Sequence, residues 1–285
     1  PNRESVVTGP LGKPVKAQWR FQGDTAVIEM ARASGLSIVG DAQHNDAVAA
    51  STTGTGELID KALDLGARRI IVCLGGSATT DGGLGAIRAI RSPARLKAVD
   101  FLIACDVTTQ FVDAAVVFGP QKGATASQVR LLTGRLERLV QMYRENYGVD
   151  VSKIEGAGAA GGLAGGLVAL GGKLIPGFEM VADEANLHDR VAQADLVITG
   201  EGQIDHTSYD GKVVGGVIDT AHHFNKPVAA IVGSIDFELV IDDALIRPNP
   251  LLAISEIYGR EKAMNEPLWC IEHATLELLR NYVVN

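Results

Sequence analysis

The sequence is poor in several features that mark particular classes of protein. It holds three cysteines, Cys73, Cys105 and Cys270, an odd number that cannot pair completely within one chain. Cys73 and Cys105 lie in apolar runs, as buried reduced thiols do, so a reducing cytoplasm is the simplest compartment. No apolar run approaches the roughly 20 residues of a membrane helix, and residues 1–30 lack a signal-peptide pattern. We therefore expect a cytoplasmic protein without a membrane partner.

Positive charge is also scarce. The chain carries 26 basic and 34 acidic residues, a formal net charge of −8, whereas a general nucleic-acid binder usually presents a basic face. We therefore expect no nucleic-acid partner. Small anions are not excluded, because glycine loops and helix N-termini bind phosphate without net positive charge.

Several catalytic motifs are missing as well. The chain contains no G-x-x-x-x-G-K-[ST] motif, which excludes a P-loop kinase. The triplet 76–78 lacks the G-x-S-x-G spacing of a nucleophile elbow, which weakens a hydrolase interpretation. The six histidines form no zinc set, because Cys270 and His273 have no second pair at ligand spacing.

Glycine, by contrast, is abundant: 33 residues gather in clusters at the edges of apolar segments. Between these clusters, predicted strands alternate with predicted helices, which indicates an α/β fold with a mostly parallel sheet covered on both faces. At this length we expect two domains, residues 1–180 and 181–285. The strands are predicted at 70–74, 101–105, 195–199, 227–232 and 251–255, and the helices at 57–65, 129–143, 211–224 and 267–282.

The first glycine cluster, residues 74–85, follows a predicted strand and places hydroxyls and a carboxylate among glycines. Successive backbone N–H groups in such a loop can form an anion-binding nest, and Asp81 could orient a substrate. The alternative is a glycine-rich turn in which Asp81 or Thr80 caps the next helix. The residues predicted to bind phosphate or substrate here are Gly75, Gly76, Ser77, Thr79, Gly82 and Gly83.

The second cluster, residues 117–124, holds Lys122 between a Gly-Pro turn and another glycine. A lysine fixed in this way is a point charge suited to phosphate. The alternative is an exposed turn lysine, the commoner fate of a single lysine.

The third cluster, residues 156–162, matches the dinucleotide fingerprint G-x-G-x-x-G. A true fingerprint follows an apolar strand, and residues 150–155 are only weakly strand-like. The motif match keeps a dinucleotide-dependent oxidoreductase as an alternative function, and the weak strand before it keeps this from being the main interpretation.

The fourth cluster, residues 195–205, places Glu201 and Asp205 just past the end of a predicted strand. Ligands of open α/β sheets bind at that edge, and a carboxylate there can accept a proton or ligate Mg²⁺. Lys212 opens the next predicted helix and adds an ammonium group to the helix dipole. The alternatives are a turn or capping role for Asp205 and a solvated position for Lys212.

These four clusters together resemble the type-one bacterial glycerate kinases. Single motifs are weak indicators, but their shared order along the chain is specific. The resemblance implies two α/β domains, one of them Rossmann-like, with the active site in the cleft between them. It also implies ATP, Mg²⁺ and D-glycerate as ligands and 2-phosphoglycerate as the product. Further segments that share the resemblance are 7–12, 25–31, 33–36, 52–59, 105–108 and 226–234.

The resemblance also suggests roles for individual residues in an in-line phosphoryl transfer. Asp205, with Glu201 near it, is expected to act as the base or as a Mg²⁺ ligand. Asp81 is expected to orient the substrate, while Lys122 and Lys212 neutralise phosphate or carboxylate charge.

The chain departs from the family pattern at its start and near residues 91–97. It begins downstream of a strand with an Asp-Ser-Phe-Lys-type motif and of an Ala-Asp-Gly-Gly-Glu-Gly motif, so we expect the Rossmann-like domain to lack its N-terminal part. Near residues 91–97 a further stretch is expected to be absent. A truncated, non-catalytic domain that binds a nucleotide or anion is therefore a third hypothesis.

Overall fold

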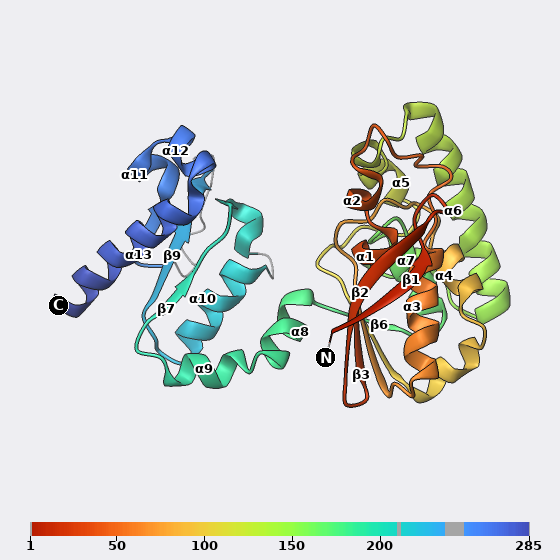
Figure 1. Ribbon diagram of the computed structural model, residues 1–285, viewed down its shortest axis with the longest axis horizontal. Coiled ribbons are helices and arrows are strands. Elements are labelled where there is room, and N and C mark those ends of the chain that lie inside the picture. The colour runs from red at the N-terminus through yellow and green to blue at the C-terminus, as the bar shows by residue number, and fades with distance from the viewer. Residues whose placement is uncertain (1, 210–211, 237–247, 285) are drawn as a thin grey trace. The chain divides into compact units, whose positions relative to one another are not determined.

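The computed structural model describes residues 2–209, 212–236 and 248–284. The chain forms two compact units, Pro1–Gly177 and Phe178–Asn285 (Figure 1). Each unit combines helices with a largely parallel sheet, so the predicted α/β class is confirmed. Within the described ranges, no helix is long and apolar enough to cross a membrane.

Unit 1 is built on a six-stranded sheet whose spatial order follows the chain order. The first two strands pair antiparallel, and the third strand pairs antiparallel with the second. The last four strands run parallel, which brings their carboxyl ends to one edge of the sheet. The strands are β1 (Asn2–Thr8), β2 (Pro14–Gln22), β3 (Thr25–Glu29), β4 (Arg69–Cys73), β5 (Asp100–Ala104) and β6 (Lys173–Ile175).

The helices of unit 1 pack around this sheet (Figure 1). The longest, α6, starts three residues earlier than the sequence predicts because Thr125 and Gln128 form a capping box, and it ends at Gly148 in a left-handed conformation. Its buried face supplies Leu132 and Leu136 to the core. The helices are α1 (Ala31–Ser34), α2 (Leu36–Val39), α3 (Thr53–Asp64), α4 (Leu84–Ala89), α5 (Ala114–Phe118), α6 (Ala126–Tyr147) and α7 (Leu163–Ala169).

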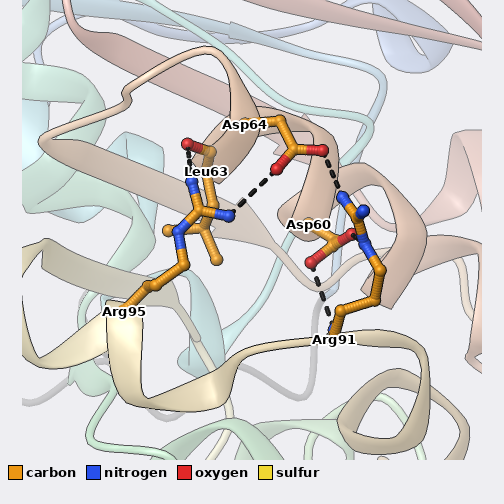
Figure 2. Close-up of polar contacts among 5 residues, drawn as sticks. All are labelled: Asp60, Leu63, Asp64, Arg91 and Arg95. Atoms are coloured by element: carbon orange, nitrogen blue, oxygen red, sulfur yellow. Dashed lines mark hydrogen bonds and ion pairs between the residues drawn. The ribbon is translucent and has the colours of Figure 1, made fainter.

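A polar network holds the segment after α4 against α3 (Figure 2). Arg91 Nε donates to Asp60 Oδ2 at 2.6 Å, and its guanidinium also pairs with Asp64. Arg95 Nη1 donates to the other oxygen of Asp64 at 2.9 Å, and the Arg95 side chain reaches the carbonyl of Leu63. Asp60 is only 6% exposed, so the positive charge of Arg91 compensates for the loss of water around this carboxylate.

Unit 2 contains a three-stranded parallel sheet in the order β11-β9-β7. Every residue of its central strand β9 is buried, and the side chains alternate between two apolar clusters. One cluster includes residues of α10 and the other includes residues of α13, so helices cover both faces. The strands are β7 (Val197–Thr199), β8 (Gln203–Ile204), β9 (Val228–Val232), β10 (Ser234–Ile235) and β11 (Leu251–Ala253). The helices are α8 (Gly177–Glu184), α9 (Leu187–Gln193), α10 (Val213–His223), α11 (Ile254–Tyr258), α12 (Arg260–Asn265) and α13 (Pro267–Val284).

The predicted strand at 251–255 is too long. The run 251–255 is apolar enough for a strand, but β11 stops at Ala253 and α11 starts at Ile254. Ile254 joins the cluster around α13, so it is buried as a helical residue, a distinction that a short apolar run cannot make. The predicted helix 211–224 corresponds to α10, and Gly211 itself lies outside the described residues.

Candidate active site

The glycine loop, defined here as residues 75–83, leaves the carboxyl end of β4. Its first part is accessible: Gly75 and Gly76 are exposed and Ser77 is half-buried. Leu36 N donates to Gly76 O at 2.9 Å, which fixes this backbone, and Gly76 has a φ of 73° that favours glycine. In the described part of the chain, the N–H groups of residues 75–77 donate to no protein acceptor. Consecutive unpaired amides around a left-handed residue are what an anion-binding nest requires.

The second part of the glycine loop is buried and already hydrogen-bonded. Gly82 N donates to Gly161 O at 3.0 Å, and Tyr143 Oη donates to Gly82 O at 2.8 Å. Gly83 N donates to Asp81 Oδ1 at 3.1 Å. A Cβ on Gly82 would lie 2.5 Å from Leu139 Cδ1, so glycine is needed here for close packing. In this conformation the amides of Gly82 and Gly83 belong to the interior, together with the fully buried Thr79.

Asp81 connects the glycine loop to the start of α3. Its carboxylate accepts from Thr52 N at 2.8 Å, from Thr52 Oγ1 at 2.9 Å and from Gly85 N at 3.2 Å. The bonds to Gly83 and Gly85 satisfy amides at the start of α4, as the capping alternative expects. A carboxylate with this many donors positions the loop, and its proposed contact with substrate stays a prediction.

Lys122 is not the exposed turn lysine that the alternative interpretation describes. Its side chain is only 2% exposed, and Nζ donates to Thr79 O at 2.7 Å. Burial lowers the pKa of Lys122 to about 7, although the nearby negative charge of Asp81 acts in the opposite direction. The turn that carries it ends at Gly123, where a Cβ would lie 2.0 Å from Ala42 O.

Two carboxylates at the same sheet edge were missed by the motif analysis. Glu29 ends β3 and Asp106 lies two residues after β5, and both are exposed. Burial first, then the charges of Glu29 and Asp106, raise the pKa of the Cys73 thiol at the end of β4. Asp106 Oδ1 also accepts from Gly177 N, the first residue of α8, at 2.6 Å. A sequence signal existed for Asp106, which directly follows the predicted strand 101–105, at the edge where open α/β sheets bind ligands.

The acidic loop, defined here as residues 200–205, leaves the carboxyl end of β7 in unit 2. Gly233 N donates to Glu201 O at 3.0 Å, and Ser234 N donates to Gly202 O at 3.1 Å. These bonds tie the loop to the segment that follows β9. Glu201 Oε1 is buried and has no hydrogen-bond partner among the described residues. A buried carboxylate oxygen without a donor is a suitable ligand for a hard cation such as Mg²⁺.

Asp205 follows β8, and Lys212 lies at the start of α10. Asp205 N donates to Ser208 Oγ at 3.0 Å and Ser208 N donates to Asp205 O at 3.1 Å, which shapes the turn. Lys212 is the exposed N-cap residue of α10, where the helix dipole favours negative charge. Over residues 2–209, 212–236 and 248–284, no group of three or more His, Cys, Asp or Glu side chains could hold a metal. Mg²⁺ commonly uses one or two carboxylates plus substrate phosphates, and Glu201 supplies one buried carboxylate oxygen of this kind. Binding of Mg²⁺ by Glu201 and Asp205 stays a prediction.

The predicted dinucleotide fingerprint lies in a different context from the one it requires. Residues 156–162 follow a 3₁₀ turn, Val151–Lys153, and form a series of turns ahead of α7. A Cβ on Gly161 would lie 2.0 Å from Thr79 O, so this segment packs against the back of the glycine loop. Since no strand precedes it, the structure does not support the oxidoreductase alternative.

The chain is similar to known proteins over most of its length. The model of the glycerate kinase family matches residues 2–92 and 89–246. A glycerate kinase of Halalkalibacterium halodurans is 40% identical over 290 residues, covering 88% of this chain and 76% of the relative. A glycerate 2-kinase of Escherichia coli K12 is 40% identical over 267 residues, covering 82% and 70%. A crystal structure assigned to glycerate kinase 2 from Salmonella typhimurium LT2 is similar over 99% of this chain and 84% of its own, with a TM-score of 0.73 and 36% identity.

Proposed function

Because the chain belongs to the glycerate kinase family and is a kinase, we propose that it transfers the γ-phosphoryl group of ATP to D-glycerate, forming 2-phosphoglycerate. The observation that carries the proposal is the match of the family model to most of the chain, together with about 40% identity to glycerate kinases. The structure adds two loops at carboxyl ends of parallel strands, the position at which open α/β sheets bind ligands.

In unit 1, the accessible amides of residues 75–77 bind an anionic oxygen of the substrates. Phosphoryl transfer requires little covalent participation by the protein, so positioning and charge stabilisation supply most of the catalysis. Ser77 adds a hydroxyl donor to these amides. Thr79, Gly82 and Gly83 hold the shape of the loop from inside, and Asp81 fixes its end against α3.

In unit 2, Asp205 accepts the proton of the glycerate hydroxyl as that oxygen attacks the phosphorus. Glu201, through its unpartnered buried oxygen, and Asp205 would hold Mg²⁺. When bound, Mg²⁺ would neutralise charge that develops on the transferred phosphoryl group. Lys212 and the N-terminus of α10 attract the phosphate to this loop.

The proposal is tested by incubating the purified chain with ATP, Mg²⁺ and D-glycerate. Release of ADP measures the transfer, and coupling to enolase identifies the product, since enolase dehydrates 2-phosphoglycerate and not the 3-phosphate. In Asp205→Asn we expect kcat to fall by about 10²–10⁴-fold, the usual contribution of a general base. The matched control is Asp195→Asn, an exposed carboxylate next to β7 that we expect to leave kcat unchanged.

Three outcomes would count against parts of the proposal. An unchanged kcat in Asp205→Asn removes that residue from the role of base. A product that enolase does not accept overturns the assignment of the phosphorylated hydroxyl. Binding of ATP without any product favours the third hypothesis, a binding domain that turns nothing over.

A further inference from the structure

The side chain of Lys122 is buried against the glycine loop and contacts it through Nζ. Nζ donates to Thr79 O at 2.7 Å, two residues beyond the accessible amides of residues 75–77. Asn45 links the glycine loop to the turn that carries Lys122, because its Nδ2 donates both to Ala78 O and to Lys122 O, each at 2.9 Å. The lysine is therefore attached to the backbone that carries the proposed anion site.

The surroundings of this lysine leave polar groups unmatched. Among the described residues, Nζ forms no ion pair with a carboxylate, and its other neighbour is the ring of Phe118, whose centroid lies 5.8 Å away. Thr79 and Thr80 are 0% and 1% exposed, and the Oγ1 atoms of both residues have no hydrogen-bond partner in that part of the chain. Asn45 Oδ1 is likewise buried without a partner. The buried amine therefore has no carboxylate in direct contact among the described residues, although the charge of Asp81 acts on it.

The charged groups around Lys122 can be named element by element. Asp81, on the glycine loop, acts on the ammonium through its charge, but its oxygens are already occupied by the amides and hydroxyl at the starts of α3 and α4. On the turn that carries Asn45, His44 and Asp41 are exposed and pair with each other at 2.8 Å. Asp46 on the same turn is exposed, and its carboxylate accepts from the amides of Val48 and Ala49. From α5 the neutral ring of Phe118 lies near the amine.

We propose that Lys122 is the buried countercharge of the glycine loop and takes up one proton from solvent when an anion binds at residues 75–77. The inference rests on the proposed function, since it assumes that this loop binds an anionic substrate. In the free protein the neutral amine is the cheaper form to bury, because desolvation penalises the ammonium. A bound carboxylate or phosphate reverses this preference by adding a negative charge to the loop that Lys122 Nζ contacts. The balance is simple: the Nζ lone pair accepts H⁺, and no other bond changes.

Burial lowers the pKa of Lys122 to about 7, so at pH 8 most molecules carry the neutral amine before the anion binds. The Cys73 thiol at the same sheet edge does not compete for this proton, since its pKa is raised and it stays protonated. Proton uptake at pH 8 therefore reports on the lysine.

The test is isothermal titration calorimetry of D-glycerate into the intact chain at pH 8, in buffers of different ionisation enthalpy. D-glycerate is fully ionised at this pH, so the ligand contributes no proton of its own. We expect the wild type to take up about half a proton or more per bound glycerate, and Lys122→Met to take up almost none. The matched control is Lys97→Met, which removes an exposed lysine and should keep the wild-type uptake.

The outcomes separate the two proposals. A heat of binding that is independent of the buffer overturns the role of Lys122 and leaves the proposed function standing. Equal proton uptake by Lys122→Met and the wild type has the same consequence. No binding of D-glycerate to the wild type, with or without Mg-ATP, overturns the proposed function and this inference with it.

A second measurement covers the case in which Lys122→Met does not fold. In the wild type, the affinity for D-glycerate should weaken between pH 7 and 9 by several-fold per pH unit, because binding requires a proton that becomes scarcer. An affinity that stays flat over this range overturns the inference without any variant.

Discussion

Replacing Lys122 by methionine should change how the stability of unit 1 depends on pH. The pKa of this lysine is about 7 in the folded chain and 10.5 in the unfolded chain. Between these values the unfolded chain binds more protons than the folded one, so the free energy of unfolding rises with pH. The contribution of this lysine to the free energy of unfolding is therefore largest at high pH and is lost as the pH falls through about 7.

The size of the effect follows from proton counting. At pH 8 the unfolded chain holds nearly one more proton than the folded chain at this residue, which corresponds to about 1 kcal/mol per pH unit. Below about pH 6 both states are protonated and the slope vanishes. Burial raises the pKa of the Cys73 and Cys105 thiols, and these groups oppose the trend above about pH 8.5, which sets the upper limit of the measurement.

Urea unfolding followed by tryptophan fluorescence measures this slope in unit 1 alone. Trp19 is buried in unit 1, and Trp269 belongs to unit 2, so a Trp269→Phe background leaves a single reporter. We expect the unfolding free energy to rise between pH 6.5 and 8.5 with Lys122 present and to lose this rise in Lys122→Met. Equal slopes in the two proteins, or stability that falls with pH in the parent, would refute the assignment of a buried, largely neutral lysine.

Three further predictions concern packing and polar contacts of unit 1. Asp81→Ala should lower the unfolding free energy by about 3 kcal/mol in a urea titration, since backbone donors at two helix starts lose a charged acceptor; a loss below about 1 kcal/mol would contradict this positioning role. Gly161→Ala should lower both the melting temperature and the kinase rate, because a Cβ there meets a backbone oxygen of the glycine loop at 2.0 Å. Gly66→Ala is the matched control, with a similar positive φ and no atom within 4 Å, so equal losses in both would show that backbone strain alone is responsible. Asp60→Asn should destabilise the chain more than Asp64→Asn in thermal unfolding, since only the first carboxylate is buried, and the reverse order would contradict the network in Figure 2.

The positions of the two loops were predictable from local order along the chain. The glycine loop follows β4 and the acidic loop follows β7, as the alternation of apolar runs and glycines indicated. Residues 75–77 lie at the accessible start of the first loop, whereas Gly82 and Gly83 lie inside. The sequence pattern could not separate them, because both stretches are equally rich in glycine.

The α/β class, the order of most strands and helices, and membership of the glycerate kinase family could be read from the sequence, since each depends on periodicity or on motifs in a fixed order. The contacts of Asp81 and Lys122 could not, because they join distant parts of the chain. Asp81 bonds to Thr52, 29 residues away, and Lys122 bonds to Thr79, 43 residues away. Burial and pKa arise from contacts across such distances, and these contacts leave no local pattern for a sequence to display.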